Sequence, residues 1–443
     1  MQPSANGNRA PAGEPRFGPD PAVTLANVLI LSLVFPPDSV STGEIMADLA
    51  VDLRDRGHSV TVLTTAPHYN RDADAEARQP MRPFWGSLLR RSDYHGIAVY
   101  HAAMPGKTPS VLKRVLAWAG FHTVSTVAGI VAVPRPDVLL VPSPPLSIGV
   151  SAWIISALRR SRFVYNVQEI YPDIAVNLGA LKNIRAIRAL EALERFVYRK
   201  AAIVTVIADR MRQRLLAKGV ETAKVRVIPN FVDLDRLTPV ARDNDFSRRH
   251  RLLESFSVSY AGNMGPAQGL ATVIDAARLL EPTDGPIEFL LIGNGMLKDS
   301  LSAAAAALPL ENVKVLPYQP NAMMPEIYGA SDVCLVAQAA ATGSDAIPSK
   351  VYRIMASGRP LIAITDPQSD LAMLVREAEC GAVIEPGNAR ALADMVRQAH
   401  RNRGAWQAMG LRGRAHVAVH YSRPAIVARY DALLREIAAT RPA

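Results

Sequence analysis

Short apolar runs alternate with helical patterns along the chain, and this alternation starts afresh near the middle. In the first half, apolar runs bounded by turn residues occur at 27–34, 59–64, 138–141, 163–167 and 203–207. The second half contains six more, at 256–260, 287–292, 313–316, 333–336, 361–364 and 382–384. Buried parallel strands joined by crossover helices produce such a pattern. The sequence therefore predicts an α/β protein with two doubly wound domains, and its 443 residues exceed what one hydrophobic core usually serves.

The predicted domain boundary lies in a polar stretch between Asp235 and Arg251, where the apolar periodicity breaks. We place the first domain at 23–237 and the second at 238–421. Residues 1–22 are rich in Pro, Gly and Ala and lack an apolar core, so a disordered extension is expected there. Residues 422–443 have the pattern of an amphipathic helix that can return to the first domain.

The charge of the chain is uneven. The net charge is +10, and residues 1–235 carry 28 basic and 20 acidic side chains. A basic first domain indicates an anionic partner, such as phospholipid head groups, a polyphosphate substrate or nucleic acid. Nucleic acid is disfavoured, because only 6% of the residues are aromatic and the chain has no zinc finger or Lys/Arg block. Solvated helix faces would explain any single basic cluster equally well.

Two features of the apolar sequence bear on location. The segment from Val115 to Val133 is long enough to cross a membrane, but it contains four polar residues and α/β patterns follow it directly. We therefore expect a helix buried against a sheet, whose basic start suits a membrane surface. Cys334 and Cys380 lie in apolar surroundings, which is typical of buried packing residues in a reducing compartment.

Glycine-rich loops follow several predicted strands, where a doubly wound sheet binds its ligands. These loops contain Thr42–Gly43, Gly262 to Gly269 and Gly293–Asn294–Gly295. Glycine lets the backbone approach a phosphate, and the N-terminus of the following helix favours its negative charge. None of the three is a complete dinucleotide fingerprint or P-loop, so each alone is a weak signal. Gly106–Lys107–Thr108 resembles a P-loop ending, but His101 stands where the first glycine belongs.

Ten ordered motifs, read together, make the interpretation specific. They are FPPDSVSTGE, RGHSVTVLT, SPPLSIG, VQEIYPD, LGALKN, LERFVYRKA, VIPNFVD, YAGNMGPAQGL, LIGNG and PSKVYRIMASGRPLIA. The set resembles family 4 of the retaining glycosyltransferases, and within it the transferases of bacterial surface polysaccharides, such as the O-antigen L-fucosamine and colanic-acid transferases. The match extends from about Asn27 to Tyr421.

The resemblance implies the GT-B fold, in which two Rossmann-like domains face each other across a cleft. The first domain then holds the acceptor, and the second holds a nucleotide-sugar donor, UDP- or GDP-linked. It further implies a cytoplasmic enzyme, peripheral to the inner face of the cytoplasmic membrane through its basic first domain. The expected acceptor is a saccharide linked to polyprenyl diphosphate.

The resemblance also implies the donor contacts by position. They are Thr42, Gly43, Gly262, Asn263, Gly265, Gln268, Gly293, Asn294, Gly295, Tyr318, Gln319, Ser349, Lys350 and Arg353. Relatives usually have an Arg and a Lys near the positions of Asn263 and Gln268, so two expected cations are missing. Lys350 is the best remaining cation for the diphosphate, and a solvated lysine at a helix start is the alternative. The nucleoside is expected near residues 293–295 and 318–319, where Tyr318 could equally be a packing residue.

The family's hallmark is a pair of Glu residues separated by seven others, of which the first contacts sugar hydroxyls and the second the ribose hydroxyls. Aligned on MASGRP, these positions hold Asp345 and Arg353. Asp345 keeps a carboxylate and is a candidate catalytic residue, whereas Arg353 reverses the charge and cannot accept a hydrogen bond. Either the ribose is held otherwise, or Arg353 contacts a phosphate, or the activity is altered.

The reaction that the resemblance implies is front-face attack with retention, in which the leaving phosphate takes the acceptor proton and the protein positions the substrates. No protein nucleophile, cofactor or metal is expected. Glu169 and Asp173, at a strand end, are candidates for acceptor contacts or a base, and capping is an equal alternative. His68 is a weaker candidate on the acceptor side, and His58 is expected to pack at a helix–strand turn.

Two other functions remain open. A nucleotide-sugar 2-epimerase shares the fold, but it needs paired carboxylates and a His around the sugar, which these motifs fit poorly. A catalytically degenerate scaffold that binds a nucleotide is favoured by the charge reversal at Arg353. A hydrolase is disfavoured, because the sequence has no Gly-x-Ser-x-Gly motif or metal-ligand cluster.

Overall fold

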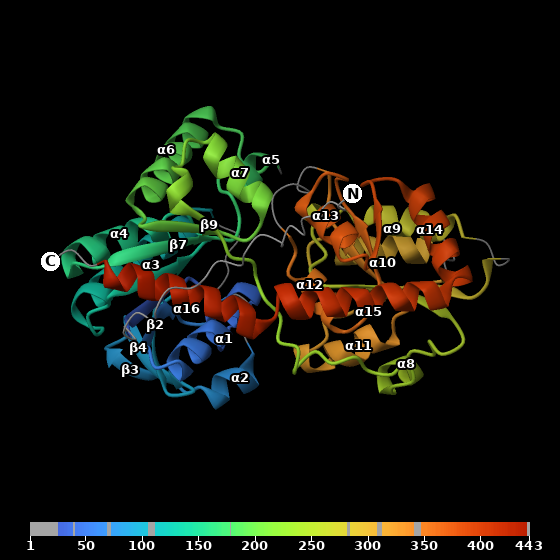
Figure 1. The fold of residues 1–443 in the computed structure, drawn as a ribbon, viewed down its shortest axis with the longest axis horizontal. Coiled ribbons are helices and arrows are strands. Elements are labelled where there is room, and N and C mark those ends of the chain that lie inside the picture. Colours follow the sequence, from blue (N-terminus) through green and yellow to red (C-terminus); the bar gives the residue numbers. More distant parts are fainter. Residues whose placement is uncertain are drawn as a thin grey trace, which may run out of the picture.

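The computed structural model describes residues 25–38, 40–68, 72–104, 111–177, 179–280, 284–307, 312–340 and 347–440. These residues form two α/β units that lie side by side, each built around one sheet (Figure 1). The stretch at 1–22, for which we expect disorder, lies outside the described residues.

The first unit contains a nine-stranded sheet in the order β3-β4-β5-β2-β1-β6-β7-β8-β9. β4 runs antiparallel to both neighbours, and the other pairs are parallel. The strands are β1 Asn27–Leu31, β2 Ser59–Thr65, β3 Arg82–Trp85, β4 Leu89–Tyr94, β5 Ile97–Ala102, β6 Val138–Pro142, β7 Arg162–Val167, β8 Ile203–Val206 and β9 Val225–Val227. The α-helices are α1 Ser41–Asp55, α2 Ala73–Arg78, α3 Val111–Val131, α4 Ile148–Arg159, α5 Asp173–Asn177, α6 Ile184–Lys200 and α7 Asp209–Ala217.

The second unit contains a six-stranded parallel sheet in the order β12-β11-β10-β13-β14-β15. Its strands are β10 Phe256–Ala261, β11 Ile287–Ile292, β12 Val313–Leu316, β13 Val333–Ala337, β14 Leu361–Ile364 and β15 Gly381–Ile384. Its α-helices are α8 Asp245–Arg249, α9 Ala271–Arg278, α10 Lys298–Ala307, α11 Met324–Ala330, α12 Lys350–Ala356, α13 Asp370–Glu377, α14 Ala389–Arg401 and α15 Arg403–His420. Short 3-10 turns include η2 Pro266–Gln268 and η4 Asn321–Met323.

All eleven strands expected from the apolar runs are confirmed, with ends that differ by at most three residues. The sequence missed β3, β4, β5 and β9. β3 and β4 lie at the edge of the first sheet, where every residue of β3 and half of β4 are exposed. Edge strands of this kind carry polar side chains and therefore lack a continuous apolar run.

The last helix, α16 Arg423–Ala439, packs on the sheet of the first unit (Figure 1). Its side chains Ile426, Tyr430 and Leu434 belong to the same buried cluster as β1 and α1. His58 hydrogen-bonds to this helix. The Nδ1 of His58 accepts from the backbone N–H of Ala26 at 3.1 Å, so its Nε2 carries the proton and donates to Asp431 of α16 at 2.7 Å. The expectation that His58 packs at a helix–strand turn is therefore confirmed.

Two segments connect the units, and they pair with each other. The N–H of Val232 donates to the carbonyl of Tyr421, and the N–H of Arg423 donates to the carbonyl of Val232, both at 3.0 Å. The Arg423 guanidinium lies 2.7 Å from Asp52 on α1 and 3.0 Å from Asp233 on the first connection. Arg423 thus links both connecting segments to α1, and residues Val232 and Asp233 of the first segment line the cleft.

The segment that the sequence marked as long enough to span a membrane forms α3, which packs against α4. One face is buried through Phe121 and Ala128, as expected, but Leu116, Trp118, Val127 and Val131 on the other face are exposed. Among the described residues, the structure contains no helix that is both long and apolar enough to span a membrane. Cys334 and Cys380 are buried packing residues, as predicted.

Candidate functional site

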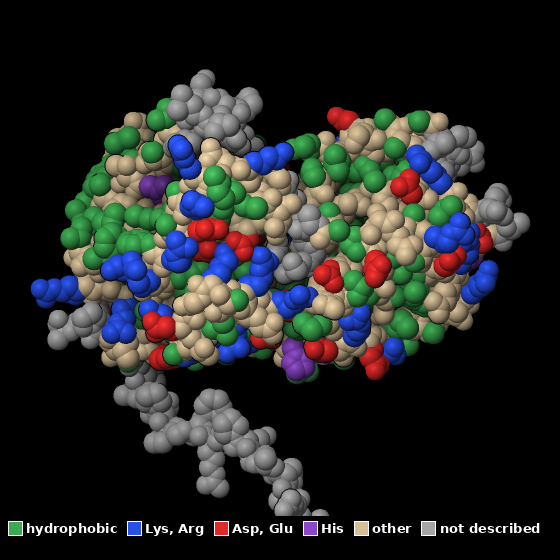
Figure 2. Space-filling model, turned by 90° about the horizontal axis from the view of Figure 1, so that it is seen from above, with side chains coloured by type: hydrophobic (Ala, Val, Ile, Leu, Met, Phe, Trp, Pro, Cys, Tyr) green, Lys and Arg blue, Asp and Glu red, His purple; other side chains and the backbone are tan. Residues whose placement is uncertain are grey.

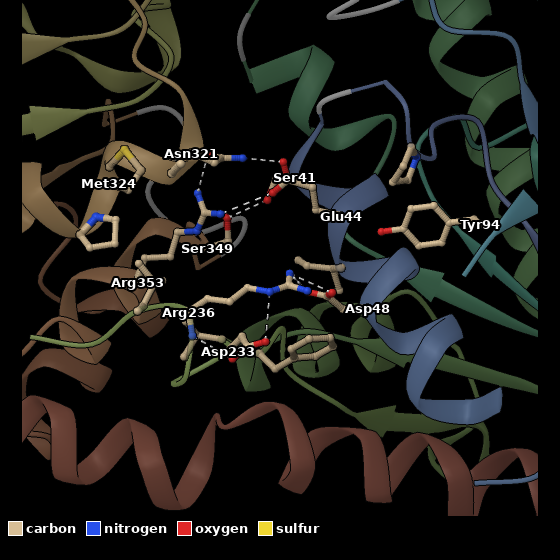
Figure 3. Close-up of a pocket in the computed structure, with 17 residues that line it drawn as sticks. Ser41, Glu44, Asp48, Tyr94, Asp233, Arg236, Asn321, Met324, Ser349 and Arg353 are labelled. Atoms are coloured by element: carbon tan, nitrogen blue, oxygen red, sulfur yellow. Dashed lines mark hydrogen bonds and ion pairs between the residues drawn. The ribbon is translucent and has the colours of Figure 1, made fainter. Parts of the chain in front are cut away.

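Two cavities open between the units and share a wall, and Figure 3 shows the residues that line the larger one. The smaller has a volume of about 170 Å³ and lies on the side of the second domain. The larger has a volume of about 480 Å³ and extends past α1 to the connecting segments. Five residues line both cavities: Ser41, Asn321, Met324, Ser349 and Arg353.

The smaller cavity lies at the carboxyl ends of the strands in the second sheet. Gly262 follows β10, Gly293 follows β11, and Tyr318 and Gln319 follow β12, and all four line the cavity. Lys350 enters it from the first turn of α12. The opposite wall is the first residue of α1, Ser41. A doubly wound sheet binds its ligands at this edge, and seven of the predicted donor residues, Ser349 and Arg353 among them, meet in this one cavity.

The glycines of these loops are required by how the loops pack on each other. The φ angle of Gly293 is +148°, and a Cβ at this position would lie 1.9 Å from the carbonyl oxygen of Gly262. A Cβ on Gly295 would lie 2.5 Å from the carbonyl oxygen of Met264. The loops after β10 and β11 also exchange hydrogen bonds, from Gly262 N–H to Ile292 and from Met264 N–H to Asn294. The two loops thus form one wall of the cavity. The sequence predicts these glycines only for the approach of a phosphate and does not reveal this packing role.

Asn263 and Gln268 stabilise their own loop. The side-chain oxygen of Gln268 accepts from the N–H of Gly265 at 2.9 Å, and the Asn263 amide lies 3.5 Å from it. The Asn294 side chain accepts from Lys298 at 3.2 Å on α10. Among the described residues that line the smaller cavity, the cations are Lys350 and Arg353.

Lys350 lies against the face of an aromatic ring. Its Nζ is 3.9 Å from the centroid of Tyr260, a cation–π contact. Gly262 makes room for the ammonium group, because a Cβ there would lie 2.5 Å from Nζ. Part of the residue is exposed, but Nζ points inward, and burial lowers the pKa of Lys350 to about 7. No carboxylate among the described residues lies within 4.0 Å of Nζ to oppose this shift.

Arg353 bridges the two domains. Its guanidinium lies 3.4 Å from Oε2 of Glu44 on α1 and 3.3 Å from the side-chain oxygen of Asn321 (Figure 3). The Asn321 amide in turn donates to Oε1 of Glu44 at 2.6 Å. A second contact crosses the cleft beside this cluster, between the hydroxyls of Ser41 and Ser349 at 3.1 Å. The positive charge of Arg353 is therefore met by a carboxylate from the other domain.

A separate ion-pair network lines the larger cavity beside the segments that connect the two domains (Figure 3). Arg236 lies 3.0 Å from Asp48 and 3.4 Å from Asp233, and Arg423 lies 3.0 Å from both carboxylates. Burial raises the pKa of Asp48, and the two arginines oppose that shift. These carboxylates already have cationic partners, unlike an acidic metal site.

The predicted acceptor-side residues lie elsewhere in the first domain. Asp173 is held by Arg214 at 2.9 Å and by Lys218 at 2.6 Å, both on α7 or its end. Glu169 is exposed, yet the protein around it raises the pKa of its carboxyl group by desolvation. His68 is buried, and its backbone N–H donates to the Asp38 carboxylate at 3.0 Å. The roles proposed for Asp173, Glu169 and His68 stay predictions, with Asp173 already engaged in ion pairs.

Asp345 lies outside the described residues. Thr42 and Gly43 occupy the first turn of α1 next to Ser41, where Gly43 packs against the backbone of Phe35. Among described residues, no group of three His, Cys, Asp or Glu side chains could hold a metal ion. The expectation that no metal takes part stays a prediction.

The sequence did not single out Glu44, Asn321 or Ser41. Glu44 stands in FPPDSVSTGE, a motif quoted for its glycine, and a carboxylate in the first turn of a helix usually serves only the helix dipole. Its partner Arg353 is 309 positions away. Only the folded cleft shows that the two side chains meet.

Two doubly wound domains that face a shared cleft, with glycine loops at the strand ends of the second, form the GT-B fold. HepE of Anabaena in complex with UDP-glucose superposes with a TM-score of 0.70 at 17% identity, over 93% of this chain and 100% of that chain. WaaG, a glycosyltransferase involved in lipopolysaccharide biosynthesis, gives 0.63 at 14% identity, over 92% and 99%. The GT-B fold that the resemblance implied is confirmed.

Sequence comparison identifies the family. Residues 42–230 match the glycosyl transferase 4-like domain, and residues 242–416 match glycosyl transferases group 1. The putative colanic acid biosynthesis glycosyl transferase WcaI of Escherichia coli K12 is 27% identical over 381 residues, 84% of this chain and 91% of that protein. The probable glycosyltransferase WbjE of Pseudomonas aeruginosa is 25% identical over 59% of this chain and 66% of its own length. The chain belongs to family 4 of the glycosyltransferases.

Proposed function

We propose that this glycosyltransferase moves a sugar, with retention of configuration, from a UDP- or GDP-linked donor to a polyprenyl-diphosphate-linked saccharide during surface polysaccharide biosynthesis. The observation that carries the proposal is the smaller cavity, where Gly262, Gly293 and Lys350 face the start of α1. The names of the relatives support the pathway, since WcaI is described for colanic acid and AmsK of Erwinia amylovora for amylovoran.

The donor diphosphate fits between Lys350 and the first turn of α1. A helix of 15 residues carries a partial positive charge at its N-terminus, which stabilises a phosphate by backbone N–H groups. Lys350 supplies the full charge from the other wall of the cavity. The nucleoside then lies along Gly293, Tyr318 and Gln319, and Tyr318 is 53% exposed, which leaves its ring able to cover a base. HepE has been crystallised with UDP and with UDP-glucose, in the same fold.

The chemistry needs little from the protein beyond position and charge. In front-face attack the acceptor hydroxyl bonds to the anomeric carbon on the side from which the diphosphate leaves, and its proton passes to that phosphate. Lys350 and the α1 N-terminus stabilise the charge that develops on the leaving group. Glu169, whose pKa is raised by desolvation, is our candidate for contact with the acceptor hydroxyls.

The first domain carries the surface that we assign to the membrane. Five basic residues of α6 are exposed: Arg185, Arg188, Arg195, Arg199 and Lys200. Apolar side chains are exposed on α3, α4 and α6: Leu116, Trp118, Val127, Val131, Leu158 and Ile184. Hydrophobic side chains gather at the outer end of this domain with Lys and Arg beside them (Figure 2). Basic residues attract anionic head groups, and apolar ones insert at the interface.

A catalytically degenerate scaffold is the second candidate, favoured by the Arg353–Glu44 pair that spans the cleft. Mass spectrometry of products from a panel of nucleotide sugars and a polyprenyl-diphosphate-sugar acceptor separates the two. We expect one donor to lengthen the acceptor by one sugar, and Lys350→Ala to abolish the product. A protein that binds a nucleotide diphosphate but yields no product with any donor would favour the scaffold. A matched control is Arg278→Ala, which removes an exposed cation on α9 that lines neither cavity and should leave the product unchanged.

A further inference from the structure

The ribose of a nucleotide carries two neighbouring hydroxyls, which proteins commonly bind through a carboxylate. In this cleft the α12 residues that line the smaller cavity are Lys350 and Arg353, whose side chains have only donor groups. Three carboxylates line the larger cavity among the described residues: Glu44, Asp48 and Asp233. Asp48 and Asp233 are both occupied by Arg236 and Arg423.

Glu44 differs from the other two carboxylates in where it is held. Its partners, Arg353 and Asn321, belong to the wall that the two cavities share. Asn321 donates to one carboxylate oxygen at 2.6 Å, and Arg353 lies 3.4 Å from the other. The side chain of Glu44 is one-third exposed, at 33%. An ionised carboxylate has about four acceptor positions, so each oxygen keeps one for a ligand.

We propose that Glu44 binds the ribose hydroxyls of the nucleotide donor, and that Arg353 and Asn321 are positioning residues that hold its carboxylate at the cavity. The proposal rests on the function proposed above. It gives the charge reversal at Arg353 a physical reason, since the acceptor carboxylate has moved to the facing domain and its cationic partner stands in its place. The nucleoside is then held by both domains at once, so full donor affinity needs a closed cleft.

The test compares a nucleoside diphosphate with its 2′-deoxy counterpart, measured by calorimetry on the full chain with UDP or GDP, whichever binds. Loss of a hydrogen bond to a charged group typically weakens binding by roughly tenfold or more. We expect the wild-type protein to bind the ribonucleotide about tenfold more tightly than the deoxyribonucleotide. Glu44→Gln should reduce this ratio to about two or less, with the affinity for the deoxyribonucleotide nearly unchanged.

Exchange of the charges tests the positioning role of Arg353. Arg353→Gln should lower the ratio, because the carboxylate loses a partner. The double variant Glu44→Gln with Arg353→Glu places a carboxylate on α12 and should restore the preference for ribose. A structural role of the ion pair alone would not produce this rescue. Asp299→Asn, an exposed change on α10, is the matched control and should leave the ratio as in the wild type.

Three outcomes would overturn the assignment. A ratio that Glu44→Gln leaves unchanged would remove Glu44 from the ribose. Tighter binding of both nucleotides by Glu44→Gln would show that the ion pair only obstructs the cleft. Absence of binding to either nucleotide by the wild-type protein would refute the proposed function, and this assignment with it, whereas normal binding without discrimination refutes the assignment alone.

Discussion

Lys350 makes donor binding depend on pH in a way that the structure allows us to calculate. With its pKa lowered to about 7 by burial, the ammonium form is about nine-tenths populated at pH 6 and about one-tenth at pH 8. A diphosphate needs the charged form, so its apparent affinity is reduced by the fraction of protein that carries the charge. Donor affinity should therefore fall about tenfold between pH 6 and pH 8.

The sign follows from the two states of the lysine. The pKa is low in the empty cavity because the charge is desolvated, and a bound diphosphate raises it again. Binding at pH 8 should take up about 0.9 proton. Calorimetry with a nucleotide sugar, in buffers of different ionisation enthalpy, measures this number directly. A nucleotide sugar is preferable to a nucleoside diphosphate, because the terminal phosphate of the latter titrates near pH 6.

The matched variant is Lys350→Arg, whose guanidinium keeps its charge throughout this range. Its affinity should be nearly independent of pH, and its binding should take up almost no proton. The reasoning fails if the wild-type affinity is flat from pH 6 to 8, or if Lys350→Arg keeps the wild-type dependence. In the latter case another group titrates with donor binding.

Three further predictions concern stability. Gly293→Ala should cost at least about 3 kcal/mol in the free energy of unfolding, measured by urea denaturation, and abolish nucleotide binding. The reason is that its Cβ would lie 1.9 Å from the Gly262 carbonyl oxygen. The control Gly387→Ala, with open space around a φ of +82°, should cost only about 1–2 kcal/mol in the same assay. Arg423→Ala should cost about 2–4 kcal/mol, since it removes the cation that contacts Asp48, Asp52 and Asp233 together and leaves Arg236 beside Asp48 and Asp233 alone. A loss under about 0.5 kcal/mol by the same assay would mean that this ion-pair network is not structural. The pKa of Asp431 is lowered because hydrogen bonds from His58, Arg435 and Arg56 outweigh its desolvation. Asp431→Asn should therefore cost about 1–2 kcal/mol in the free energy of unfolding near pH 6. The difference in unfolding free energy from wild type should vanish as the pH falls through the lowered pKa, and a difference that stays constant in acid would refute this link.

The architecture could be predicted from sequence where burial imposes a simple pattern. The central strands of both sheets are buried on both faces, so their apolar runs mark them clearly. β4, with the sequence LRRSDY, is an antiparallel strand near the sheet edge and has no such run. Its strand conformation is set by hydrogen bonds to β5, which sequence periodicity does not record.

The site was predictable only in part, because its contacts cross the cleft. Gly262 and Gly293 could be placed at strand ends by the rule for doubly wound sheets, and Lys350 by the family resemblance, and all three line one cavity. Arg353 seemed anomalous as a single position, since its partner Glu44 belongs to the other domain. The need for glycine at position 295 also could not be predicted, because Met264, whose carbonyl oxygen excludes a Cβ there, is on a different loop.

The most direct test of the central claim is a crystal structure of the protein with a bound nucleotide sugar. We expect the diphosphate to lie within hydrogen-bond distance of Lys350 Nζ and of the first-turn N–H groups of α1, with the nucleoside along Tyr318 and Gln319. A nucleotide bound outside the smaller cavity, or a diphosphate without contact to Lys350, would contradict this account of the cleft.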